Sequence, residues 1–132
     1  MRNTVRFALL AITTLVIFLT INRNPFDLFF AVTYPAPYDK SYQLFLDRCG
    51  TCHSIDTALG VDSYLPSDWK DVVDRMQKKP SSGISTQEAD EIYKFLVYDS
   101  TVNHKKELDA QLQQLPEAER KAEEEQIKQA LQ

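Results

Sequence analysis

The sequence predicts an all-α protein, in which a small helical domain follows an apolar segment and precedes a polar helical segment. Between residues 39 and 102 apolar side chains recur at helical spacing, and no stretch alternates with the period of two that a half-buried strand shows. The length of 132 residues suits one modest domain with extensions. The net charge of -4 argues against a nucleic-acid partner, and only three glycines leave no phosphate-binding loop.

Residues 1–32 predict an N-terminal membrane anchor. An apolar run, Phe7–Ile21, follows Arg2 and Arg6, and residues 26–32 are apolar again after a proline. About 15 residues give roughly 22 Å of helix, which is short against a hydrocarbon core of about 30 Å. A cleaved signal peptide is therefore the alternative, but no small-x-small cleavage site follows the run, and we expect the segment to be retained.

Residues 33–38 form a Pro-rich linker, and three helices are expected in the domain of residues 39–102. The first is Asp39–Arg48 and the second is Ser67–Lys79, with a proline just before its start. The third is Ser85–Tyr98, because Ser85 and Glu88 have the spacing of a capping box.

Residues 103–132 predict a polar helical extension, rich in Glu, Gln, Lys and Ala. A weak apolar stripe that includes Leu108 and Leu112 runs along it. Two interpretations remain open: a solvated helix or frayed tail, and a helix that docks on a partner subunit.

The motif that carries chemistry is Cys49-Gly50-Thr51-Cys52-His53, the Cys-x-x-Cys-His pattern of covalent haem attachment. Two thiols at this spacing can bond the two vinyl groups at one edge of haem, and the next residue, His53, can bind the iron. A redox dithiol needs a βαβ context that is missing, and a zinc site needs more ligands than His53 and His104 supply.

Met76 is the expected second axial ligand. It shares one helical face with Trp69, Val72 and Val73, and this face can cover the open side of a haem. Met76 as an ordinary core residue, His104 as the ligand, and an open iron that binds gases are the alternatives.

The chain resembles the class I c-type cytochromes over residues 38–100, on the haem motif, the Trp69–Met76 segment and the closing helix. The resemblance implies one haem c attached to Cys49 and Cys52, with His53 as proximal and Met76 as distal ligand, and electron transfer outside the cytoplasm. It departs from mitochondrial-type members because Met76 lies on a helix, without a proline-rich loop before it.

We therefore expect a membrane-tethered monohaem electron carrier without substrate chemistry, single-pass, with its haem domain on the periplasmic side. Its partners would be redox proteins and other subunits of a respiratory or photosynthetic membrane complex. The cations at positions 70, 75, 78 and 79 either steer an acidic partner or form a solvated face. A haem-based redox or gas sensor and a structural subunit are the alternative functions.

Overall fold

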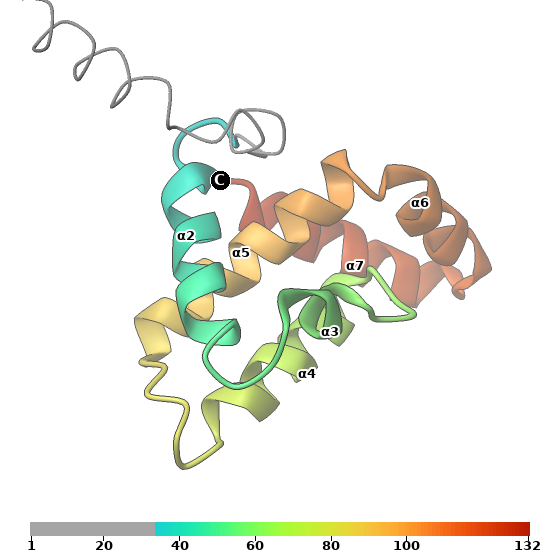
Figure 1. The fold of residues 1–132 in the computed structure, drawn as a ribbon. Helices are drawn as coiled ribbons and strands as arrows, with labels where there is room; N and C mark the ends of the chain where they lie inside the picture. Colours follow the sequence, from blue (N-terminus) through green and yellow to red (C-terminus); the bar gives the residue numbers. More distant parts are fainter. Residues whose placement is uncertain (1–33) are drawn as a thin grey trace, which may run out of the picture. The chain divides into compact units, whose positions relative to one another are not determined.

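Residues 34–132 are described in the computed structural model, and they form six helices without any strand among them. The helices are α2 (Tyr38–Cys49), α3 (Ile55–Leu59), α4 (Pro66–Gln77), α5 (Thr86–Val102), α6 (Lys105–Gln114) and α7 (Glu117–Ala130) (Figure 1). The all-α prediction is confirmed for this part of the chain.

The expectation of a single-pass membrane protein is corrected. Within residues 34–132 no helix combines the length and the apolar character needed to cross a membrane. The longest, α5, has 17 residues and carries charged side chains such as Glu88, Asp90 and Lys94. The segment predicted as the anchor, residues 1–32, lies outside the described residues.

Local signals explain where the central helices begin. Pro66 opens α4 at the first helical position, where its missing N–H costs least. Ser85 caps α5 through a capping box: its hydroxyl accepts the Glu88 N–H at 3.2 Å, and the Glu88 carboxylate accepts the Ser85 N–H at 2.8 Å. The one-turn helix α3 was not predicted, and it is capped by the Ser54 side chain.

Helix α5 is the centre of the fold. It packs against α2, α4, α6 and α7, and Figure 1 shows it crossing the middle of the molecule. Its helical spacing places apolar side chains on the faces that meet these neighbours. The main core cluster joins α2, α4 and α5 and consists of Phe45, Trp69, Val73, Ala89, Ile92, Phe95 and Leu96.

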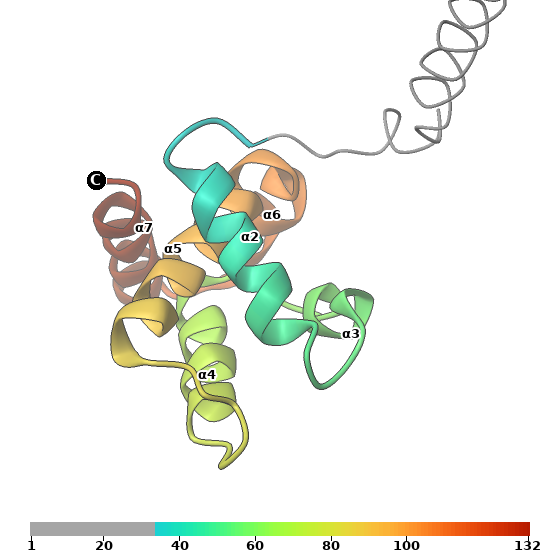
Figure 2. The ribbon, with the colours of Figure 1, turned by 60° about the vertical axis from the view of Figure 1, so that its left-hand side comes forward.

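The C-terminal segment folds back on the domain. Its helical prediction is confirmed, but a break at Leu115 and Pro116 divides it into α6 and α7. Helix α7 packs against both α4 and α5, and it lies on the opposite side of the core from α3 (Figure 2). Leu108 and Leu112 are buried, so the apolar stripe of α6 faces the chain's own domain and the frayed-tail interpretation does not apply.

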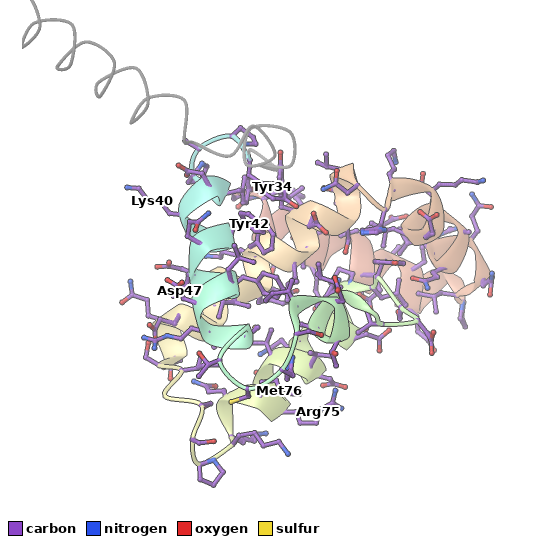
Figure 3. The ribbon with its side chains drawn as sticks, viewed as in Figure 1. Tyr34, Lys40, Tyr42, Asp47, Arg75 and Met76 are labelled. Atoms are coloured by element: carbon purple, nitrogen blue, oxygen red, sulfur yellow. The ribbon has the colours of Figure 1, made fainter. Side chains whose placement is uncertain are left out.

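The beginning of the described chain is tied to α5 by aromatic packing. The Tyr34 hydroxyl donates to the buried Asp99 carboxylate at 2.6 Å, and its ring meets Phe95 edge-on at 5.0 Å. Burial and the nearby Asp99 charge raise the pKa of Tyr34. Tyr38 stacks on Tyr98 with ring centres 3.8 Å apart. In Figure 3 the rings of Tyr34 and Tyr42 lie beside α5, whereas Lys40 and Asp47 point outward from α2.

Acid stability should depend on Glu88. The Ser85 N–H, followed by the Arg48 side chain, lowers the pKa of this carboxyl from 4.5 to about 2. A lowered folded-state pKa contributes stability that is complete above pH 4.5 and is lost as the pH falls toward 2. In Glu88→Gln, denaturant unfolding should show a shallower loss of stability across this window. Glu91→Gln removes the same charge from the same helix, and its stability should fall with pH as steeply as that of the wild type. An equally steep fall of stability in all three proteins would contradict the prediction.

Candidate functional site

A cavity of about 410 Å³ opens between α2, α3, α4 and α5, and all five predicted site residues line it. Its volume falls within the range typical of cofactor pockets, about 300–1,000 Å³. The structure thus brings together side chains from the end of α2, the loop after it, and α4. These residues are Cys49, Cys52, His53, Trp69 and Met76.

The two cysteines both line the cavity but differ in exposure. Cys49 ends α2 and is half-buried, whereas Cys52 is exposed in the following loop, and both are free thiols. Burial raises the pKa of the Cys49 thiol to about 11, the opposite of the lowered pKa that activates a redox dithiol.

The motif residues themselves complete the end of α2. The Gly50 N–H donates to the Leu46 carbonyl at 2.9 Å, and the Thr51 hydroxyl donates to the Asp47 carbonyl at 2.7 Å. A Cβ at Gly50 would lie 2.6 Å from the Leu46 oxygen, closer than real contacts allow. Glycine between the cysteines therefore allows the close turn that directs Cys49 and Cys52 to the same cavity.

His53 is half-buried, and its Nδ1 lies 3.1 Å from the Ser54 carbonyl oxygen. A carbonyl only accepts, so this contact favours the tautomer that carries its proton on Nδ1. That tautomer leaves the lone pair of Nε2 available to a metal ion. A backbone contact of this kind is the usual way in which a protein orients a ligating imidazole.

Trp69 fixes the helix that carries Met76. Its side chain is 2% exposed, and its indole Nε1 donates to the Ser100 hydroxyl at 2.8 Å. Ser100 in turn donates to the Leu96 carbonyl at 3.0 Å within α5. Trp69 and Met76 share one face of α4, so the bond that fixes Trp69 also directs this face toward the cavity that both residues line. Met76 lies near the end of α4 in Figure 3.

His104, the alternative ligand, lies elsewhere. Its ring stacks on Tyr64 with centres 4.2 Å apart, and its Nε2 is 3.8 Å from an Asp99 oxygen. It does not line the cavity. The geometry therefore leaves Met76 as the soft ligand candidate that shares the cavity with His53.

Most of the cavity wall is formed by residues outside the predicted site. Apolar side chains from four helices and two loops form most of the wall, among them Phe45, Val61, Val72, Ile84 and Ile92. Helical periodicity identifies Val72, which shares the Met76 face, but the others come from segments whose approach depends on the fold.

The rim of the cavity is basic. Arg48 forms an ion pair with Glu88, while Arg75 and Lys79 line both the cavity and a neighbouring surface depression. Lys78, Asp71 and Asp74 also line that depression. Arg75, Lys78 and Lys79 form no ion pair with any other described residue, whereas Lys70 pairs with Asp74 at 3.2 Å. Two of the four predicted cations, Arg75 and Lys79, thus line the cavity, Lys78 lies in the neighbouring depression, and Lys70 is neutralised within α4.

The donor set fits haem better than a bare metal ion. Within residues 34–132 no three His, Cys, Asp or Glu side chains converge as metal ligands, as a structural zinc site would require. A haem c with histidine and methionine ligands would use two thiols at one edge, an imidazole, a thioether and a large apolar wall, with cations for its carboxylates. The cavity residues supply each of these.

Comparison with known proteins gives no match to a family model, to a curated protein or to a solved structure. The class of site is therefore defined by the residues in the cavity alone.

Removing the Ser100 hydroxyl should destabilise the domain. In Ser100→Ala the buried Trp69 N–H loses its acceptor, which costs about 1–3 kcal/mol of unfolding free energy. Thr101→Val removes the neighbouring hydroxyl, whose bond to the Tyr98 carbonyl is local to α5, and should cost less than about 0.5 kcal/mol. In a Trp69→Phe background the Ser100→Ala change should cost less than in the wild type. Equal costs in both backgrounds, measured by denaturant unfolding, would show that the bond contributes nothing.

Proposed function

We propose that the chain is a monohaem c-type cytochrome that carries single electrons between redox proteins. Cys49 and Cys52 would hold haem c through two thioether bonds, and His53 and Met76 would be the axial ligands. The observation that carries the proposal is one apolar cavity that these four side chains and Trp69 line together. Bound haem supplies the chemistry, a one-electron exchange between ferric and ferrous iron.

The protein's own residues would set the redox properties of the site. Methionine ligation and apolar walls both favour the less charged ferrous state and raise the potential. The Ser54 carbonyl holds the His53 imidazole in one tautomer, and the Trp69 indole holds α4 against α5. Ligands on fixed backbone change little between oxidation states, which suits electron transfer.

The basic rim would meet the redox partner. Arg75, Lys78 and Lys79 place positive charge beside the cavity on a chain whose net charge is -4. Such a patch attracts an acidic surface and mainly accelerates encounter. The partner would then approach the cavity where Arg75 and Lys79 line it.

Covalent attachment is the first expectation to test. After expression with a haem-attachment system, the wild-type chain should keep haem on a denaturing gel stained for peroxidase activity, with a matching intact mass. The Cys49→Ala/Cys52→Ala double variant should lose all covalent haem. Met76→Ala is the matched control, because it leaves both thiols in place and should stain like the wild type. A wild-type chain of apoprotein mass would contradict the proposal.

Iron ligation is tested with Met76. Met76→Ala should lower the midpoint potential and allow ferrous haem to bind carbon monoxide, because one axial position then lacks a protein ligand. Val72→Ala changes the same helical face and should bind little carbon monoxide, and His104→Ala should match the wild type. Redox titration and absorption spectra provide the measurement. An unchanged potential in Met76→Ala would assign the second ligand elsewhere, and a wild-type protein that binds carbon monoxide would favour a gas sensor.

A further inference from the structure

The C-terminal helices hold the chain segment that leads into α4. The Gln111 side chain on α6 forms two hydrogen bonds to the backbone of this segment: it accepts the Tyr64 N–H at 2.9 Å and donates to the Asp62 carbonyl at 2.8 Å. Glu123 on α7 accepts the Ser67 N–H at 3.0 Å. Side chains separated from this segment by 47 to 56 residues therefore satisfy three of its backbone groups.

The first turn of α4 has no cap of its own. Leu65, at the N-cap position, has no side-chain oxygen to offer, and Pro66 has no N–H. The Ser67 N–H is consequently the first amide of the helix that needs a partner, and Glu123 provides it. A carboxylate at this end of a helix is also favoured by the helix dipole.

Glu123 is buried, although its side chain carries a carboxylate. Its residue is 8% exposed, which is rare for a glutamate unless it is hydrogen-bonded. The same helix also reaches α5, where the Tyr93 hydroxyl donates to Gln126 at 3.4 Å. Burial, followed by the Glu123 charge, raises the pKa of Tyr93, which agrees with the closeness of the two groups. Helix α7 is thus braced on α5 and presents Glu123 to α4.

The contact between Ser67 and Glu123 lies at the opposite end of α4 from Met76, so it can influence where the Met76 side chain lies. Met76 lies nine residues after Ser67 on the same helix, about 14 Å along its axis. A small change in the tilt of α4 at its start therefore moves the Met76 sulfur substantially. At the far end the half-buried Ser82 hydroxyl donates to the Gln77 carbonyl at 3.0 Å.

We propose that Glu123 and Gln111 are positioning residues for Met76, so that α6 and α7 act as a brace for the axial ligand. The inference rests on the proposed function, because it concerns how firmly Met76 binds haem iron. It also gives residues 103–132 a role inside the chain: they fix the orientation of α4 rather than dock on a separate subunit.

The test compares haem-loaded, full-length variants. Glu123→Ala should increase amide exchange at Ser67 and the extent of carbon monoxide binding to ferrous haem by about tenfold, the loss expected for one hydrogen bond. Glu123→Gln keeps an acceptor oxygen and should restore both values to near the wild type. Glu124→Ala is the matched control: it removes the same charge next to Glu123, from an exposed pair with Arg120.

Gln111→Ala is a second test for the case in which Glu123→Ala does not fold. Gln111 is less buried than Glu123, and its loss should also raise carbon monoxide binding. Haem-loaded Glu123→Ala and Gln111→Ala proteins with wild-type carbon monoxide binding and midpoint potential would overturn the brace and leave the proposed cytochrome intact. A wild-type chain that carries no haem would overturn the proposed function itself. The two failures are therefore distinct.

Discussion

The hydrogen bond from the Trp69 indole to Ser100 is the constraint on which the site depends. It is buried, it joins two residues that are 31 positions apart in the sequence, and it fixes how α4 rolls against α5. An indole N–H without an acceptor in this core would be costly, so a single orientation of α4 is strongly preferred. That orientation turns Val72 and Met76 toward the cavity and directs the charged side of α4 to solvent.

The hydrophobic core and the cavity share the same residues. Phe45, Trp69 and Ile92 belong to the core cluster and also line the cavity wall. A domain of this size buries a limited fraction of its surface, and a flat apolar cofactor would extend its core. Stability and cofactor binding are then properties of one set of contacts, and a substitution in the wall should affect both.

The features of the fold that could be predicted from the sequence are those with a local signal. The capping box at Ser85 placed the start of α5, and helical spacing placed Met76 beside Trp69 on one face. The Cys-x-x-Cys-His motif predicted residues that line the cavity. The membrane expectation was wrong for the described chain, whose helices are short and charged. The bonds of Gln111 and Glu123 were not foreseeable, because helical pattern alone does not tell which polar side chain meets a distant backbone group.

The same distinction between local and distant contacts describes how the site is built. Neighbouring residues supply its chemistry: Gly50 allows the turn between the cysteines, and the Ser54 carbonyl orients His53. Distant residues supply its position, through Ser100 and Glu123 at separate points on α4. Both contacts lie in the first turn of α4, one to the Ser67 backbone and one to the Trp69 side chain, and together they orient the start of the helix. A thioether binds haem iron weakly enough to depend on such support. In this chain the C-terminal helices therefore belong to the proposed cofactor site, although none of their residues lines the cavity.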